Sequence, residues 1–244
     1  MIKKLILLLL SFFDFFYQKR IIKFLSKENL TNIETLFDVG GHKGESINLF
    51  LSNMKVKKII SFEASPLNFR FLKKSREHYS KKFNKTEILI ENIALGSRNK
   101  EIDFKQFDES SSSTLNDINE ESSYFKRKFN LLDFFSKKKK YQILKIKIET
   151  LDNYMDLNNI NKISFLKIDT EGYEYEILKG LKKKIQFVDT IMFEHHYDNM
   201  IIKNYTFTDI NNFLKMNNFN QIYKSKMPFR KTFEYIYKRK ELIN

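Results

Sequence analysis

The 244-residue chain contains no cysteine, no tryptophan, two prolines and six glycines. The absence of cysteine excludes disulfide bonds and metal sites built from thiolates, and it leaves the redox compartment undetermined. The hydrophobic runs are also short: none reaches the ~20 apolar residues that a helix needs to cross a bilayer. Hydrophobic residues make up 42% and aromatic residues 15% of the chain, so it is not a disordered polymer. Its length favours one large domain with insertions.

Acidic residues are too few to balance the basic ones. The chain has 44 lysines and arginines against 30 acidic residues, which gives a formal net charge of +14. A nucleic-acid-binding protein usually gathers its basic residues on one face. Here the lysines are spread along the whole chain, so we interpret the charge mainly as a solvated surface. An acidic substrate or an anionic membrane is the alternative interpretation.

The amino-terminal stretch is the one candidate for a targeting segment. Two lysines precede the apolar run Leu5–Phe13, which is broken by a single serine and ends at Asp14. This run resembles the start of a signal peptide, but no cleavage site of small residues follows it. A helix that continues through Ile22 and Phe24 can dock on the domain or lie on the inner membrane surface. We expect docking and a cytoplasmic protein, with a peripheral membrane contact as the alternative.

The stretch Thr35–Glu45 predicts a strand, a tight turn and the start of a helix. The strand ends near Asp38, and Gly40 and Gly41 follow it. Glycines permit positive φ and the close approach of a ligand, and Gly44 permits close packing of strand and helix. The stretch therefore predicts a site for a nucleotide-type cofactor, with a plain connecting loop as the alternative.

A second acid strengthens the prediction of a cofactor site. Lys57–Glu63 reads as the next strand and ends on a carboxylate, which is placed to accept both hydroxyls of a ribose. In nicotinamide-binding turns no acid normally precedes the glycines, whereas Asp38 does so here. A carboxylate at Asp38 suits a cofactor with a positively charged amino group. The two acids therefore indicate S-adenosylmethionine rather than NAD.

Strands alternate with helices from Thr35 onward, which predicts a parallel sheet with helices on both faces. After the third strand, Glu87–Glu91, Asn92 is placed to meet a base edge. Tyr141–Thr150 alternates isoleucine or leucine with lysine and predicts an edge strand. We divide the chain into an apolar helical extension, residues 1–30, and a domain, residues 31–244. The domain carries a polar insertion or lid at about residues 108–140.

The second half of the predicted sheet supplies the candidate catalytic groups. They are expected at the carboxyl ends of adjacent strands, where open α/β sheets place ligands, and they are Asp169, Glu171, Glu194 and His195. Such a set can act as a general base, hold a divalent ion or surround a sulfonium cation. Nothing in the spacing demands a metal, so none is expected. His195 and His196 are adjacent on a strand, so only one ring can face the site. Glu171 has a second interpretation as a helix cap.

Six blocks of the chain carry a family resemblance: Phe37–Gly44, Phe62–Pro66, Asn92–Gly96, Ser112–Leu115, Thr150–Asp152 and Leu166–Glu174. Together they resemble the FkbM family of S-adenosylmethionine-dependent methyltransferases. The resemblance implies a Rossmann-like, seven-stranded class I methyltransferase fold in the α/β class. Its sheet would be mostly parallel, with an antiparallel end strand and helices on both faces.

The resemblance also implies roles for individual residues. By position, Asp38, Gly40 and Gly44 would hold the methionine part of the cofactor, Glu63 the ribose, and Asn92 with Ala94 the adenine end. Gly41, Lys43 and Ala64 are the other residues expected to bind S-adenosylmethionine. Asp169 would face the centre of methyl transfer.

The predicted function is O-methylation of a hydroxyl, most plausibly on a sugar of a surface glycan, by in-line displacement with a carboxylate or His195 taking the proton. One alternative is a nucleic-acid methyltransferase, although no motif for flipping a base is present and no nucleic-acid partner is expected. Another alternative is a non-catalytic, membrane-associated module on the same fold.

Overall fold

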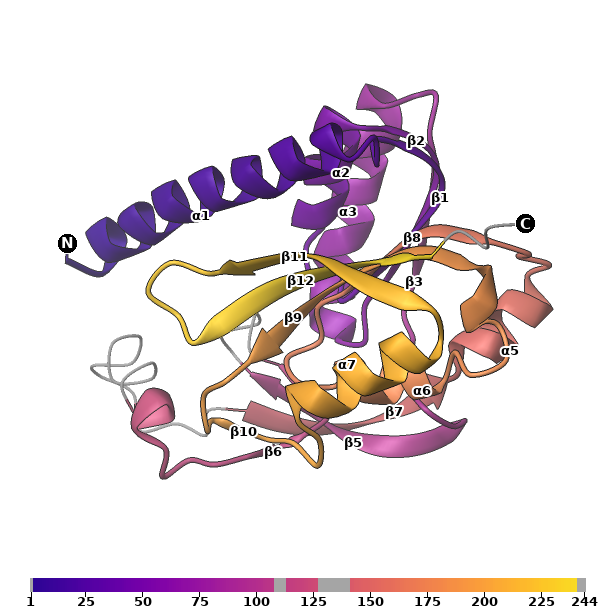
Figure 1. Cartoon of the computed structure of the whole chain (residues 1–244). Helices are drawn as coiled ribbons and strands as arrows, with labels where there is room; N and C mark the ends of the chain where they lie inside the picture. Colours follow the sequence, from indigo (N-terminus) through magenta and orange to yellow (C-terminus); the bar gives the residue numbers. More distant parts are fainter. Residues whose placement is uncertain (1, 108–112, 127–140, 241–244) are drawn as a thin grey trace.

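A seven-stranded sheet forms the centre of the computed structural model, which describes residues 2–107, 113–126 and 141–240, with only the backbone for residues 2–11. The strand order is β11-β12-β9-β8-β1-β2-β3, and every neighbouring pair is parallel except those that include β12 (Figure 1). The bounds are β1 Asn32–Val39, β2 Lys55–Phe62, β3 Glu87–Glu91, β8 Ile163–Ile168, β9 Val188–His196, β11 Phe219–Lys226 and β12 Thr232–Arg239.

Helices cover both faces of this sheet. On one face α1, α2 and α3 share a hydrophobic core with the sheet, and on the other face α5, α6 and α7 do so. The predicted mostly parallel α/β fold is confirmed, with the antiparallel strand β12 one position inside the edge strand β11. The helices are α1 Ile2–Lys27, α2 Glu45–Asn53, α3 Pro66–Lys82, α5 Leu151–Leu157, α6 Glu174–Lys179 and α7 Phe207–Met216, and η2 Ile185–Phe187 is a short 3₁₀ turn.

The strand order reverses between β1 and β8. The chain runs from β1 through β2 to β3 on one side of β1, and then returns to place β8 and β9 on its other side. Such a reversal leaves a crevice outside the carboxyl ends of the strands, where ligands of open α/β sheets bind. Residues that follow Val39, Phe62 and Ile168 therefore meet at one edge.

Local sequence signals set the helix starts. Ser65 accepts the backbone N–H of Asn68 at 3.1 Å, and Pro66 occupies the first turn of α3. A capping box starts α7, because Thr206 and Asp209 each accept the other's backbone N–H. These caps fix where the chain leaves the sheet edge.

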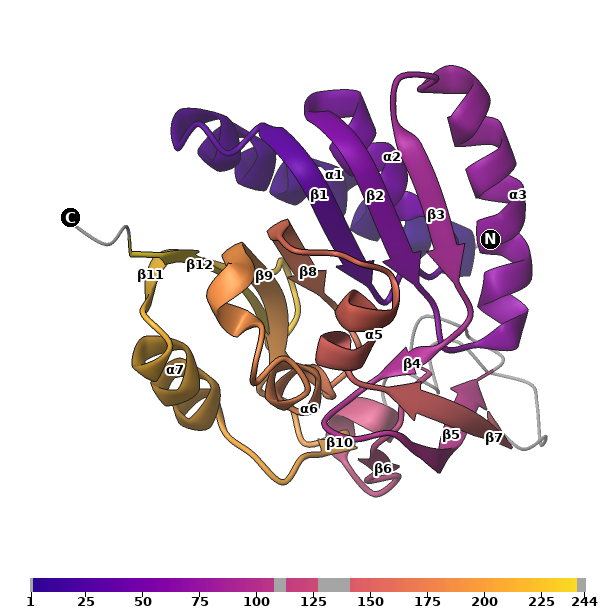
Figure 2. The same ribbon diagram turned by 90° about the vertical axis from the view of Figure 1, so that its right-hand side faces the viewer.

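A second, smaller sheet lies beside the carboxyl ends of the main strands (Figure 2). It has the order β4-β7-β5, and a further two-stranded pair joins β6 to β10. The prediction of Tyr141–Thr150 as an edge strand is wrong, because β7 lies between β4 and β5. Its isoleucine–lysine alternation reflects one solvated face, which a middle strand of a one-sided sheet also has. The bounds are β4 Ala94–Leu95, β5 Lys100–Phe107, β6 Asp117–Ile118, β7 Tyr141–Glu149 and β10 Ile201–Ile202.

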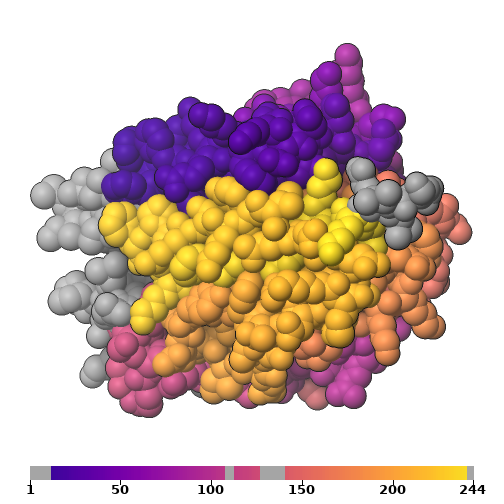
Figure 3. Space-filling view, in the orientation of Figure 1, coloured from indigo at the N-terminus to yellow at the C-terminus, as the bar shows by residue number. Residues whose placement is uncertain are grey.

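The expected docking of the amino-terminal helix is present for its second half. Tyr17, Ile21 and Leu25 are buried against the sheet, and α1 lies along the β11–β12 hairpin (Figure 3). Among the residues that the structure describes, no helix is long and apolar enough to cross a membrane. The proposed domain division stays a prediction, and the lysine-rich residues 127–140 and serines 110–112 lie outside the described residues.

Candidate active site

Four side chains form a charged row across the sheet, one layer inside its carboxyl edge. Asp38 lies on β1, Lys167 on β8, Glu194 on β9 and Glu234 on β12. Side chains two positions apart on a strand point to the same face of the sheet. The residues two positions from these four charged side chains, toward the other end of the sheet, lie in the core beneath α1, α2 and α3: Leu36, Phe165, Met192 and Ile236. The charged row therefore lies on the face that α1, α2 and α3 cover.

The ammonium group of Lys167 is the centre of this row. Its Nζ lies 3.2 Å from Oδ1 of Asp38 and 3.4 Å from Oδ2 of Asp169. The Ser61 hydroxyl donates a 2.8 Å hydrogen bond to the other oxygen of Asp38, whose side chain is fully buried. The expectation that Asp38 meets a cationic group of a cofactor is therefore not supported, because Lys167 supplies the positive charge at that position.

Burial and mutual repulsion keep protons on part of the row. Burial alone lowers the pKa of Lys167, but the charges of Asp38 and Asp169 outweigh it and raise the pKa above its usual value. Burial, followed by the charge of Asp169, raises the pKa of both Glu194 and Glu234. One ammonium thus faces Asp38 and Asp169, while Glu194 and Glu234 release their protons at higher pH than exposed glutamic acids do.

The two adjacent histidines point to opposite faces of β9. His195 is buried beside the rings of Tyr197 and Phe207, at centroid distances of 4.7 and 5.8 Å, on the face away from the charged row. Burial and then the charge of Lys203 lower the pKa of His195 to about 3. The assignment of His195 to the catalytic set is therefore corrected: the structure brings His196 to the acids instead.

His196 sits among three carboxylates. Its Nε2 lies 3.6 Å from Glu171 and 3.8 Å from Glu194, and its Nδ1 lies 3.6 Å from Asp198. Burial favours the neutral ring, but the charge of Glu171 and the contact with Asp198 outweigh it and raise the pKa of His196 to about 9. The ring is therefore a cation at neutral pH and a poor proton acceptor.

A short loop between β8 and α6 displays Asp169 and Glu171. Helix α6 begins only at Glu174, because Glu171 and Gly172 have positive φ values of 51° and 94°. The buried Glu174 carboxylate accepts the backbone N–H groups of Gly172 and Thr170 at 2.9 and 3.3 Å. Glu171 caps no helix, and Thr114 binds its carbonyl oxygen at 2.9 Å.

The glycine bend after β1 is required by the protein's own packing. Gly40 has φ 87°, and a Cβ there would lie 1.8 Å from the backbone oxygen of Asp169. A Cβ on Gly41 would lie 2.0 Å from Oγ of Ser61. Both glycines thus let the loops after β1, β2 and β8 close together. Lys43 extends over the ring of Phe71 at 5.4 Å, and Gly44 forms the N-cap of α2.

The carboxylate of Glu63 is fixed at the end of β2. Its two oxygens accept the backbone N–H groups of His42 at 2.7 Å and Ser65 at 2.8 Å. Burial raises the pKa of Glu63 to about 7 in spite of these bonds. The side chain of Asn68 also hydrogen-bonds this carboxylate, and a carboxylate with three donors still has acceptor capacity for a further one. Asn92 donates to the Glu63 backbone oxygen at 2.8 Å and so ties the next loop to the same place.

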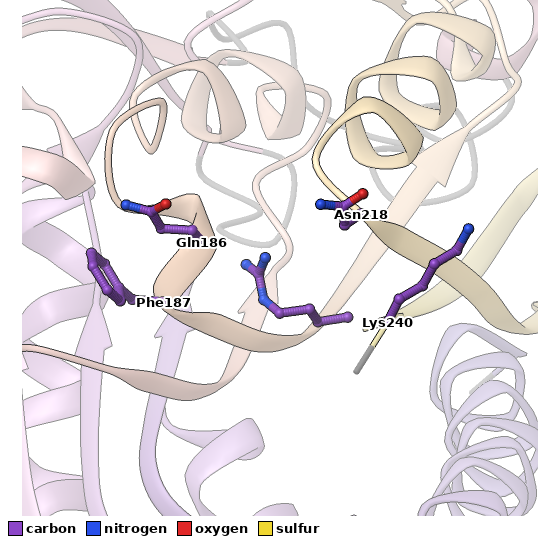
Figure 4. Close-up of a pocket in the computed structure, with 5 residues that line it drawn as sticks. Gln186, Phe187, Asn218 and Lys240 are labelled. Carbon is purple, nitrogen blue, oxygen red and sulfur yellow. The ribbon is translucent and has the colours of Figure 1, made fainter. Parts of the chain in front are cut away.

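The sheet edge therefore assembles part of the predicted set. Gly41, Glu63, Ala64, Asn92, Asp169 and Glu171 lie in the loops that follow β1, β2, β3 and β8. Ala94 does not belong with them, because it is 4% exposed in β4 and packs in the hydrophobic core. A hollow of about 400 Å³ lies at the opposite ends of the strands, lined in part by Gln186, Phe187, Asn218 and Lys240 (Figure 4).

Three buried polar residues in or beside the charged row were not predicted from the sequence: Ser61, Lys167 and Glu234. Lys167 stands between Leu166 and Ile168, and Glu234 stands between Phe233 and Tyr235. A charge with apolar neighbours on both sides in a buried strand is the signal that could have identified them. Ser61 gave no such signal. Among the described residues, no group of three or more His, Asp or Glu side chains is arranged to hold a metal ion.

The strand order and the helices on both faces are those of the Rossmann-like class I methyltransferase fold. Residues 38–221, more than half of the chain, match the sequence model of the methyltransferase FkbM domain. The chain therefore belongs to the FkbM methyltransferase family. No curated protein matches the chain in sequence.

Solved structures share this fold at low sequence identity. Methyltransferase FkbM from Methylobacillus flagellatus is 14% identical with a TM-score of 0.54, over 84% of this chain and 43% of that one. The chain thus spans less than half the length of that protein. Magnesium protoporphyrin IX methyltransferase from Synechocystis, solved with S-adenosylmethionine, is 8% identical with a TM-score of 0.50, over 92% of this chain and 78% of that one. These likenesses show the fold alone.

The family implies S-adenosylmethionine as the cofactor, and the edge residues fit it in part. Glu63 presents a carboxylate with acceptor capacity for hydroxyl groups. Ala64 is half-buried and Asn92 exposed beside it, so both have surface available to a ligand. Asp38, which is enclosed by Lys167 and Ser61, offers none.

We predict that Lys167→Met destabilises the fold by about 3–5 kcal/mol at pH 8, because it leaves buried carboxylates without a cation. The loss should shrink toward pH 5.5. The acids of the row then titrate further above their unfolded pKa values, so the native state binds more protons than the unfolded chain and stability falls as pH rises. Urea unfolding at both pH values measures this.

Lys162→Met is the matched control, because Lys162 pairs with Asp189 at 2.8 Å on the surface. Its effect should stay within about 0.5 kcal/mol at either pH. Equal losses for the two variants would contradict a central role for Lys167.

Proposed function

We propose that this protein is an S-adenosylmethionine-dependent O-methyltransferase that acts on a sugar hydroxyl of a surface glycan. The observation that carries the proposal is the pair of carboxylates at the carboxyl edge of the main sheet, where the strand order reverses. There the fixed carboxylate of Glu63 and the partly exposed carboxylate of Asp169 follow strands on the two sides of β1. The first can hold the cofactor and the second can meet an acceptor.

The cofactor side of the site is built from Glu63 and its neighbours. Glu63 would accept the two ribose hydroxyls, since the N–H groups of His42 and Ser65 fix both of its oxygens. Asn92 and Ala64 would contact the adenine end. When bound, S-adenosylmethionine supplies an electrophilic methyl group on a sulfonium sulfur.

Asp169 is the best candidate to take the proton of the acceptor hydroxyl. Its side chain is 32% exposed, so an acceptor can reach it, and Lys167 holds one of its oxygens at 3.4 Å. Glu194 is buried, which raises its pKa well above its ordinary value, and His196, with a pKa of about 9, is already protonated at neutral pH. His195 is enclosed by aromatic rings on the other face. Positioning of the two reactants would supply most of the acceleration.

A sugar acceptor is supported by the family resemblance and by the chemistry that Asp169 can perform. A carboxylate that accepts a hydroxyl proton suits an alcohol acceptor. The location that we propose is the cytoplasmic side of the cell, at the inner membrane surface. The net charge of +14 favours an anionic surface in that position.

Glu63→Ala is expected to abolish binding of S-adenosylmethionine in titration calorimetry. The native protein should bind about tenfold more weakly at pH 6 than at pH 8, because a carboxyl with a pKa of about 7 is mostly protonated at the lower pH. Glu63→Gln should weaken binding and remove this pH dependence.

Glu87→Gln serves as the control, since Glu87 lies at the opposite end of β3 and pairs with Lys58 at 3.3 Å. Native affinity in Glu63→Ala would refute the ribose assignment.

We expect Asp169→Asn to lower kcat by on the order of 10²–10⁴-fold while the affinity for S-adenosylmethionine is retained, because the amide cannot accept the proton. Release of S-adenosylhomocysteine with glycan acceptor measures kcat, and calorimetry measures affinity. Asp189→Asn, at the opposite end of β9, is the control. Native turnover in Asp169→Asn would remove this residue from the mechanism.

The acceptor is tested by mass spectrometry of surface carbohydrate from cells with and without the gene. Loss of one methyl group from a glycan fragment, restored by the native gene but not by the Asp169→Asn variant, is the expected result. An unchanged glycan together with methyl transfer to RNA would contradict the sugar assignment and leave the methyltransferase assignment standing.

A further inference from the structure

The first half of α1 exposes a cluster of aromatic side chains that the fold does not use. Phe12, Phe13, Phe15 and Phe16 lie on this half, and Phe229 lies at the tip of the β11–β12 hairpin. These five residues, called here the phenylalanine patch, are between 38% and 75% exposed. Burying such side chains would be favourable by about 1.5 kcal/mol or more for each ring, so their joint exposure calls for a partner.

The patch is one continuous surface rather than scattered residues. The rings of Phe12 and Phe16 lie 4.8 Å apart, and those of Phe13 and Phe229 lie 5.0 Å apart. Phe15 and Phe16 are in edge contact at 5.6 Å. Helix and hairpin, more than 200 residues apart in the sequence, therefore present a single aromatic surface.

Polar contacts hold the patch rigidly on the domain. Asp14 pairs with Arg230 at 2.9 Å, which joins the helix to the hairpin tip in the middle of the patch. One turn later, the hydroxyl of Tyr17 donates to the backbone oxygen of Ser225 at 3.2 Å. The exposed rings are thus a fixed feature of the surface and not a frayed end.

Basic residues surround the patch. The Nζ of Lys19 lies 4.4 Å from the ring centroid of Phe15, and Arg20, Lys226 and Lys231 are exposed. The segment 1–27 carries six lysines and arginines against the single acid Asp14, which is already paired. Aromatic side chains rimmed by cations match the headgroup region of a bilayer that contains anionic lipids.

The helix continues past the patch as an apolar segment. Its backbone is helical from Ile2, and the sequence Leu5–Leu10 is apolar at every position. At 1.5 Å per residue, the stretch from residue 5 to residue 16 is about 18 Å long, against ~30 Å for the hydrocarbon core of a bilayer. This length suits a helix that lies in the interface and does not cross it.

We propose that the phenylalanine patch and the first turns of α1 insert into the surface of an anionic lipid membrane, with α1 lying in the interface. A second copy of the chain is a poorer occupant, because its identical basic rim would face this one and repel it. The inference does not depend on methyl transfer, since it rests on residues outside the active site.

Co-sedimentation of the full chain with vesicles tests the proposal. We expect strong binding to vesicles of phosphatidylcholine mixed with phosphatidylglycerol, weak binding to phosphatidylcholine alone, and weakening as salt rises. The double variant Phe12→Ser/Phe16→Ser should lower the partition coefficient at least about tenfold, because two rings no longer enter the interface.

Leu157→Ser/Met216→Ser is the matched control, because it also removes two exposed apolar side chains, at the ends of α5 and α7. It should bind vesicles like the native chain. Equal thermal unfolding of all three proteins shows that the folds are intact. Equal vesicle binding by the two double variants would overturn the proposal.

Sedimentation velocity without lipid tests whether a second copy of the chain covers the patch instead. A dimer of the native chain that Phe12→Ser/Phe16→Ser dissociates, with no vesicle binding by either, would assign the patch to a second copy and overturn the membrane proposal. A native monomer that binds anionic vesicles supports it.

Discussion

The structure depends on one buried ammonium group. Lys167 enters the sheet at the strand-order reversal and lies within 3.4 Å of both Asp38 and Asp169. Removing a lysine from water is costly unless carboxylates surround it, and the surrounding carboxylates are equally costly without the lysine. Loops after β1 and β8 must therefore close around this pair, and glycine at position 40 is what allows them to come so near. The geometry of the edge follows from this electrostatic requirement.

The same requirement separates the roles of chemically similar groups. Asp169 is the member of the Lys167 cluster that reaches solvent, whereas Asp38 is enclosed. Glu194 and Glu234, one and two strands further on, have raised pKa values because burial and the charge of Asp169 oppose their ionisation. Under the proposed function, an acceptor at this edge would meet the carboxylate of Asp169 with Lys167 behind it. Glu194 and Glu234, whose pKa values are raised, would be ionised to a smaller extent than they are in water and so would be less available to take its proton.

Order along the chain could be predicted from the sequence, but pairing across the sheet could not. Strands that end on acids placed Glu63 and Asp169 at one edge, because parallel strands share a direction. The partner of Asp38 was missed, since Lys167 is 129 residues away and becomes its neighbour only through the β1–β8 register. For His195 and His196, alternation requires one ring on each face, yet no local signal says which face carries the acids. The late start of α6 was missed because two successive positive-φ residues have no clear sequence signature beyond Gly172.

The amino-terminal helix connects the two surfaces of the molecule that carry function. Tyr17 is buried in the hydrophobic core on the face of the sheet that carries the charged row, and burial, followed by the charges of Glu234 and Glu194, raises its pKa. The same turn of α1 that covers these acids also borders the phenylalanine patch, because Phe16 precedes Tyr17 and points outward. A force that shifts α1 at a membrane would therefore act on the wall of the charged row. Water admitted there would favour ionisation of Glu194 and Glu234, so the position of α1 and the proton content of the row are physically linked.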